Sequence, residues 1–146
     1  NNWKKFRELT LDKSNQRFID VYKAENYSTE AWINTLFGNY SKAKELLKKH
    51  YDIASKWDSP SALDNYNGVS GMVYVMEGNP SKALEYFNDR IAPSNYQYYS
   101  YFKALALKAT QNEKEAKEIF EFIANYNFAS WEPALTRELS KKELDS

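Results

Sequence analysis

Residues 71–87 read GMVYVMEGNPSKALEYF, and this stretch decides the fold. Its apolar residues recur every three or four positions on either side of a break at residues 78–81, Gly-Asn-Pro-Ser. Glycine suits the left-handed residue that ends a helix, and proline followed by serine suits the first turn of a new helix. The stretch therefore predicts a helical hairpin, in which a tight turn joins two antiparallel helices.

The pattern of this hairpin recurs in the chain. Two sets of residues are in register at a spacing of 33 positions: Gly71, Tyr74, Asn79, Ala83 and Phe87 in the middle copy, and Ala104, Leu107, Asn112, Ala116 and Phe120 in the next. An earlier copy contains Ala31, Gly38, Asn39, Ala43 and Leu47, and its two alanines and its leucine precede their counterparts in the middle copy by 40 residues. Self-similarity at this period is the sequence signature of stacked helix pairs.

Small residues occupy the positions where the two helices of a hairpin should meet. Gly71 and Ala104 fall in the middle of first helices, where glycine costs about 1 kcal/mol relative to alanine. Ala83 and Ala116 fall on the partner helices. Because small side chains let helices approach closely, we expect Ala83 and Ala116 to be almost fully buried and to face Gly71 and Ala104.

The copies resemble the tetratricopeptide repeat (TPR) family. The middle copy matches the family pattern at Gly71, Tyr74, Gly78, Ala83 and Phe87, and the third copy matches with conservative changes at Ala104, Leu107, Ala116 and Phe120. The first copy has Asn34 where the family usually has an aromatic residue, and the second and third copies lack the usual tryptophan near the start of the first helix. The resemblance covers about residues 24–125. It implies an all-α fold, a right-handed α-solenoid of antiparallel helix hairpins, which binds a protein or peptide partner in its concave groove.

The whole chain, residues 1–146, is expected to form a single TPR-like helical repeat domain. Its expected parts are repeats at about residues 24–57, 64–93 and 97–125, and a capping helix at about residues 129–143. The first spacing exceeds the second by seven residues, close to two helical turns, so we expect one long helix over Tyr40–Trp57. Residues 3–24 are expected to add one or two helices in front of the first hairpin.

The capping helix is expected to have one apolar and one charged face, as the end of a repeat stack requires. Trp131, Leu135 and Leu139 would form its apolar face, and Arg137 with Lys141 and Lys142 would point outward.

One aromatic segment, residues 95–102, gives the candidate partner-binding site. The spacing places four residues on one stripe of a helix: Tyr98, Tyr101, Leu105 and Lys108. By the resemblance, this stripe lines the concave groove, and the equivalent stripe one repeat earlier includes Asn65 and Met72. Tyrosines beside Met72 would give an apolar surface with polar tips, typical of peptide recognition. Lys108 would then pair with an acidic residue or a terminal carboxylate of the partner. The alternative is that the tyrosines only fill space between repeats.

The composition excludes several function classes. The 20 basic and 20 acidic residues cancel, which argues against a nucleic-acid binder and against a polybasic membrane anchor. No apolar run approaches the 18 or so residues of a membrane-spanning helix, so we expect no membrane insertion. The absence of cysteine fits the cytoplasm and the periplasm equally well. A start at Asn1, without methionine, indicates a trimmed N-terminus.

The sequence offers no recognisable catalytic, cofactor or metal site. His50 is the only histidine, and metal sites or catalytic triads need more partners than this. Glu115, Glu118 and Glu121 alternate with lysines at helical spacing, as on a solvated face. We therefore expect a non-enzymatic scaffold.

Three other functions stay open. The first is a structural segment of a longer solenoid or a self-associating module, with Trp3 and Trp131 as candidates for apolar surface at the terminal helices. The second is RNA binding by helical repeats, and the third is a carboxylate-based enzyme domain.

Overall fold

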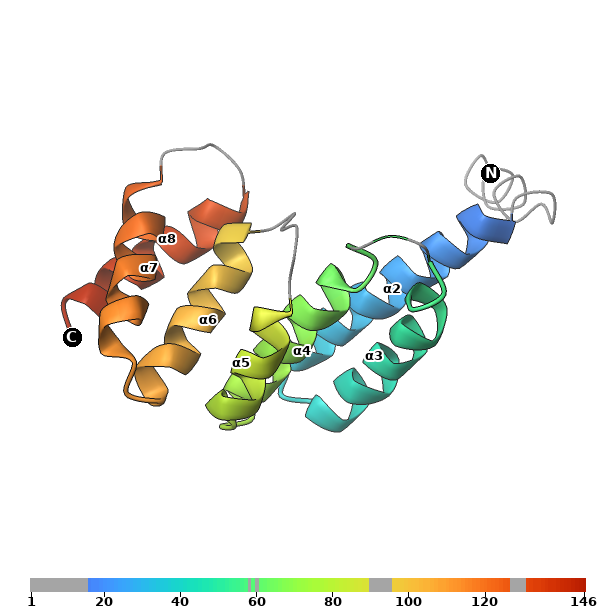
Figure 1. Ribbon diagram of the computed structural model, residues 1–146, viewed down its shortest axis with the longest axis horizontal. Helices are drawn as coiled ribbons and strands as arrows, with labels where there is room; N and C mark the ends of the chain where they lie inside the picture. Colours follow the sequence, from blue (N-terminus) through green and yellow to red (C-terminus); the bar gives the residue numbers. More distant parts are fainter. Residues whose placement is uncertain (1–15, 58, 60, 90–95, 127–130) are drawn as a thin grey trace.

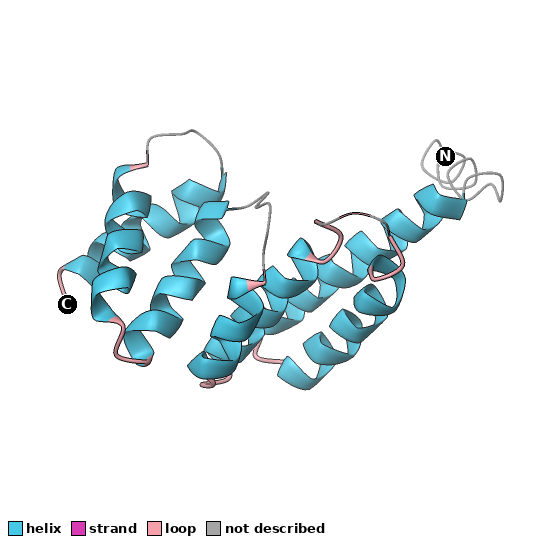
Figure 2. Ribbon diagram, in the orientation of Figure 1, coloured by secondary structure: helices cyan, strands magenta, loops and turns pink. Residues whose placement is uncertain are grey.

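The computed structural model describes residues 16–57, 59, 61–89, 96–126 and 131–146, and this part of the chain is all-helical (Figures 1 and 2). It contains no strand and has seven α-helices: α2 (Gln16–Leu36), α3 (Tyr40–Ala54), α4 (Asp64–Met76), α5 (Pro80–Asn88), α6 (Tyr96–Ala109), α7 (Glu113–Asn125) and α8 (Trp131–Leu144). The expected all-α class is confirmed.

The helices pack in the order of the chain. Helix α2 packs on α3, α4 on α5, and α6 on α7, and the first helices of successive pairs also touch, α2 with α4 and α4 with α6. Helix α8 contacts both α6 and α7. The pairs follow one another along the long axis, with the start of α2 and the end of α8 at opposite ends of the molecule (Figure 1).

One turn geometry joins the helices of all three pairs. The turn residues Gly38, Gly78 and Gln111 have φ angles of +74°, +88° and +65°. The next residue is always an asparagine, whose backbone N–H donates to a carbonyl five residues back, at 2.9, 2.8 and 2.9 Å. This is the bond that closes a helix around a left-handed residue. The recurring turns confirm that the copies align at spacings of 40 and 33 residues.

The expected burial of the small residues is also confirmed. Ala83, Ala104 and Ala116 are buried, and Gly71 lies against the ring of Phe87 from α5. A Cβ atom added at Gly71 would stand 2.5 Å from this ring. The absence of a side chain at Gly71 therefore sets how closely α4 and α5 approach.

Two expected boundaries at the first pair are wrong. Residues 16–24 belong to the same continuous helix as the first hairpin, so no separate helix lies there. The second helix ends at Ala54 instead of Trp57, because the N–H of Trp57 donates to the carbonyl of Ala54 at 3.0 Å in a tighter turn. The expected segment at residues 3–15 and the end of the second repeat at 90–93 lie outside the described residues.

The expected apolar face of the C-terminal helix is wrong, whereas Lys141 and Lys142 are exposed as expected. Leu135 and Leu139 are 52% and 41% exposed, whereas Thr136 and Ser140 are buried. Arg137 is half-buried and donates to the backbone carbonyl of Tyr126. Helix α8 thus packs through small polar side chains and leaves two leucines toward solvent. The helix starts at Trp131, whose side chain, like all of residues 127–130, lies outside the described part.

The core has two parts. The larger cluster joins α2, α3, α4 and α5 with one face of α6, which includes Tyr98, Tyr99 and Ala106. The smaller one joins another face of α6, which includes Tyr101, Ala104 and Leu107, to α7 and the end of α8. Within the described residues, no helix combines the length and the apolar character needed to cross a membrane.

Candidate partner-binding groove

The predicted tyrosine stripe is not an open surface. Tyr98 and Tyr101 are only 5% and 7% exposed, and Met72 is fully buried. The Tyr98 hydroxyl lies 3.8 Å from the Met72 sulfur, so these two side chains do converge from neighbouring first helices. The prediction that Tyr98, Tyr101 and Met72 are exposed is therefore wrong. For Tyr101 the alternative holds, in which the tyrosine fills space between helices: its ring packs on that of Phe120, with centroids 5.9 Å apart.

Helix α8 covers the C-terminal half of the stripe. Lys108 is exposed, but its ammonium donates to the Glu143 carboxylate at 3.0 Å and to the Ser146 hydroxyl at 2.7 Å. Leu105 is half-buried against the smaller core cluster. Burial raises the pKa of Tyr101, and the nearby Glu143 carboxylate adds to the rise. The carboxylate expected from a partner is thus supplied by the chain itself.

The N-terminal half of the same face remains open. A hollow of about 210 Å³ lies between the first helices, with walls from α2, α4 and α6. Two predicted residues, Asn65 and Tyr98, line it. The other lining residues are Glu25, Ser28, Thr29, Trp32, Val69 and Tyr99. We call this hollow the inner groove.

A bonded aromatic pair forms one wall of the inner groove. The indole N–H of Trp32 donates to the Tyr98 hydroxyl at 2.9 Å, and the two rings meet edge to face with centroids 6.1 Å apart. Burial raises the pKa of Tyr98, and the bond from Trp32 offsets part of that rise. Tyr99 completes the wall, and its ring packs directly against Gly68. A Cβ atom added at Gly68 would stand 2.7 Å from this ring. These contacts hold the rings in fixed positions, so a ligand would meet a preformed apolar surface.

The rim of the inner groove is polar and acidic. The Asn65 side-chain amide donates to the Glu25 carboxylate, with nitrogen–oxygen distances of 3.0 and 3.3 Å. Glu25 is exposed and Asn65 half-buried, and Ser28 and Thr29 lie one turn further along α2. An apolar wall beside one carboxylate can take an apolar side chain together with an adjacent cation.

Trp32 and Glu25 were missed at the sequence level, although the repeat spacing contains the signal. The first copy precedes the second by 40 residues, so the counterparts of Asn65 and Met72 are Glu25 and Trp32. Extending the stripe by one further copy would have placed both residues in the groove. Tyr99, by contrast, belongs to the neighbouring face of its helix, and no spacing rule marks it.

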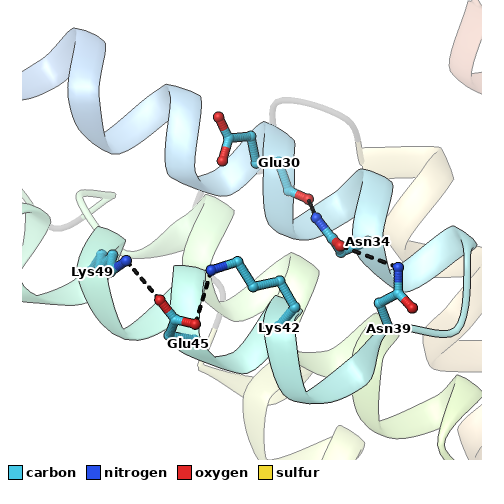
Figure 3. A network of polar contacts seen from close by, with 6 residues as sticks. All are labelled: Glu30, Asn34, Asn39, Lys42, Glu45 and Lys49. Carbon is cyan, nitrogen blue, oxygen red and sulfur yellow. Dashed lines mark hydrogen bonds and ion pairs between the residues drawn. The ribbon is translucent and has the colours of Figure 1, made fainter.

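Charged side chains outside the groove are mostly paired on exposed helix faces. Figure 3 shows one such network, in which the Glu45 carboxylate accepts from Lys49 at 2.7 Å and from Lys42 at 2.9 Å. These bonds lower the pKa of Glu45 to about 2, with Lys49 making the larger contribution. In the same view, the Asn34 side chain donates to the backbone carbonyl of Glu30 at 2.8 Å, a hydrogen bond within the last turns of α2. The described residues contain no cluster of three or more potential metal ligands.

His50 has an interhelical position. Its ring is fully buried, with Nδ1 lying 2.8 Å from the backbone carbonyl of Ala24. A carbonyl oxygen only accepts, so Nδ1 carries the proton, and the buried Nε2 has no partner among the described atoms. The ring stacks near Tyr66, at 6.3 Å between centroids. The histidine thus joins α2 to α3 and stands apart from the inner groove.

Comparisons with protein-family models, curated proteins and solved structures find no match to this chain.

Proposed function

We propose that this chain is a right-handed α-solenoid of TPR-like helix hairpins and that it binds a protein or peptide partner in the inner groove. The stacking of α2 on α4 and of α4 on α6 supports the solenoid, because first helices that touch in order form one continuous face. The three identical turns support a repeated unit. In this proposal the chain is a non-enzymatic scaffold.

The observation that carries the proposal is the position of the hollow. It lies where first helices of three successive pairs meet, and it contains the rigid Trp32–Tyr98 pair. Tryptophan and tyrosine supply much of the affinity at protein interfaces, because they bury a large area at little cost in conformational entropy.

The lining of the groove defines the ligand. Val69 and the aromatic wall suit an aliphatic or aromatic side chain, and the exposed Glu25 carboxylate suits a lysine or arginine next to it. The ligand is therefore a short segment that presents an apolar residue beside a basic one. Its affinity depends more on the aromatic anchor than on the charge, which contributes mainly to specificity and association rate.

Selection from a library of random dodecapeptides displayed on phage tests this proposal. Selected peptides should share an apolar residue beside a basic one, and Glu25→Lys should weaken their binding about tenfold, equivalent to about 1.4 kcal/mol. Isothermal titration calorimetry of the purified protein with the selected peptides measures the change.

Glu30→Lys is the matched control. It makes the same charge change on the same helix, at an exposed residue that is not part of the groove lining. Equal loss of binding in both variants would indicate a general charge effect, and selected peptides without any basic residue would contradict the assigned ligand.

Self-association is a second candidate function, because α7 and α8 expose large apolar side chains. Phe122, Leu135 and Leu139 are each more than two-fifths exposed. If these residues form an interface between copies, sedimentation velocity should show an oligomer that the double variant Leu135→Glu, Leu139→Glu converts to a monomer. A monomer at all concentrations for the parent protein would dismiss this candidate.

A further inference from the structure

A second aromatic surface lies between α3, α4 and α5, away from the inner groove. Its rings form an unbroken series: Tyr51 of α3 contacts Tyr66 of α4 at 5.1 Å between centroids, Tyr66 contacts Tyr86 of α5 at 5.8 Å, and Tyr86 stacks on Tyr74 of α4 at 5.5 Å. Helices α3, α4 and α5 follow one another in Figure 1, so three consecutive elements supply the series. We call this surface the tyrosine trough.

The trough contains two adjoining hollows of about 400 and 610 Å³. Tyr51, Tyr66 and Tyr86 line both of them, so the same three rings form the rib between the hollows. Two hollows separated by an aromatic rib suit a ligand whose bulky groups recur at a regular distance.

The first hollow is rich in hydrogen-bond donors. Besides the four phenols it is lined by Lys44, Lys48 and Ser70, and the Lys44 ammonium lies 4.8 Å from the centre of the Tyr74 ring. Its carboxylate, Asp52, already accepts from Lys48 at 3.0 Å. A ligand for this hollow should therefore offer many acceptors and few donors of its own.

The second hollow has a different character. It extends to Trp57, which is half-buried, and to the exposed Asp89. At the opposite end the two lysines are already paired, Lys44 with Glu77 at 2.8 Å and Lys48 with Asp52 at 3.0 Å. The Asp89 carboxylate therefore gives this end of the trough a negative charge, which favours a ligand with a basic group at the Asp89 end.

We propose that the tyrosine trough binds an extended proline-rich segment with a basic residue at one end. Consecutive prolines have no N–H donors, and the polyproline II helix leaves every carbonyl unpaired, which matches a surface of donors and ring faces. The trough follows α4 from about Asp64 to Tyr74, a length of about 15 Å. About five residues at 3.1 Å each fill this length, close to two turns of polyproline II.

This inference is independent of the proposed function, because the trough and the inner groove share no lining residue. Aromatic grooves recognise proline-rich segments because the ligand is already ordered before it binds. The trough adds an aromatic rib and a carboxylate at one end to that general requirement.

The test uses the full chain and a fluorescein-labelled peptide of eight prolines followed by one arginine. Fluorescence anisotropy of the labelled peptide, titrated with the protein, should show saturable binding with a Kd below 1 mM. A Kd of 1 mM corresponds to a binding free energy of about −4.1 kcal/mol. A peptide ending in glutamate should bind more weakly, and a glycine–serine peptide of equal length should not bind. The emission of Trp57, obtained as the difference between the parent and Trp57→Phe, should change on binding.

Tyr51→Ala should weaken binding at least about tenfold, and Tyr22→Ala is the matched control. Both tyrosines are more than two-fifths exposed, but Tyr22 lies on α2, outside the trough. Circular dichroism establishes whether each variant is folded, and Tyr86→Leu, which keeps an apolar group, provides a second variant of the rib.

The absence of saturable binding by the proline peptide would overturn the proposal. Equal losses in Tyr51→Ala and Tyr22→Ala, or tighter binding of the glutamate peptide, would overturn it as well. Inner-groove variants such as Glu25→Lys should leave this binding unchanged, so a failure here is distinguishable from a failure of the proposed function.

Discussion

The helix pairs α4–α5 and α6–α7 share one pattern, yet their first helices differ in what covers them: α4 lines the inner groove through Asn65, whereas α6 lines it only at its N-terminal end, through Tyr98 and Tyr99. Both have a left-handed turn residue followed by asparagine, and both bury a small residue on the first helix together with a phenylalanine on the second. In the first pair, Asn65 reaches the inner groove, whereas in the second pair α8 lies against Tyr101 and Lys108. Equivalent positions thus have different environments because their neighbours along the stack differ.

The comparison shows that a repeat pattern determines how a pair folds but not whether its inner face is accessible. Accessibility depends on the next helix: α8 contacts both α6 and α7, and it buries Thr136 and Ser140, two small polar residues. A helix with small residues on one side approaches closely and covers more of its neighbour.

The largest expected effect is at Tyr101. Because its ring is buried between α6 and α7, Tyr101→Ala should lower the free energy of unfolding by about 3–5 kcal/mol. Asn65→Ala, on the first pair, should cost only about 0.5–1.5 kcal/mol, since it removes one hydrogen bond near the surface. Urea unfolding followed by circular dichroism measures both changes. If both substitutions lowered the free energy of unfolding by the same amount, α8 would not be shielding Tyr101 from solvent.

A smaller effect is expected at Gly71. In Gly71→Ala the new methyl group meets the Phe87 ring, which has to move, and overpacking of this kind costs 1–3 kcal/mol. The gain in helix propensity is about 1 kcal/mol, so we expect a net loss of up to about 2 kcal/mol. Position 104 already has alanine, and Ala104→Gly should also destabilise, by about 1 kcal/mol. An increase in the melting temperature of Gly71→Ala would contradict the close approach of α4 and α5.

The smallest effect is expected at the turns. Gln111 has a φ of +65°, a conformation that costs a residue with a side chain about 1–2 kcal/mol, whereas Gly78 has none of this cost. Gln111→Gly should stabilise the protein by about 0.5 kcal/mol, because the entropy lost by glycine offsets much of the gain. Gly78→Gln should have the opposite sign. Thermal unfolding of both variants tests whether the two turns are equivalent, and the same sign for both would show that they are not.

Local structure was largely predictable from the sequence. The turn at Gly78 forms as predicted, because a left-handed residue is needed there and glycine tolerates this conformation. The left-handed conformation of Gln111 was not predicted. Ala83 and Ala116 are buried as predicted, because the size of a side chain limits how closely two helices approach. The position of α3 was predictable, and its last turn was not, since Trp57 bonds in a tighter geometry.

The site was predictable only in part. The helical spacing correctly predicted that Asn65 and Tyr98 line the inner groove, and the same positions 40 residues earlier are Glu25 and Trp32. The spacing did not predict the burial of Tyr101, because periodicity indicates the face of a helix on which a residue lies and not what covers that face.

The amino-acid sequence by itself determined the helices, their turns and the small residues between them, since these depend on backbone conformation and side-chain size within about 50 residues of chain. Tertiary structure alone decided which tyrosines are accessible. Tyr101 is closed off by α8, whereas Tyr51, Tyr66 and Tyr86 come from three helices and meet only when those helices pack. Exposure is a property of the assembled surface, so residues with the same helical pattern end in a core, a groove or a trough according to their neighbours.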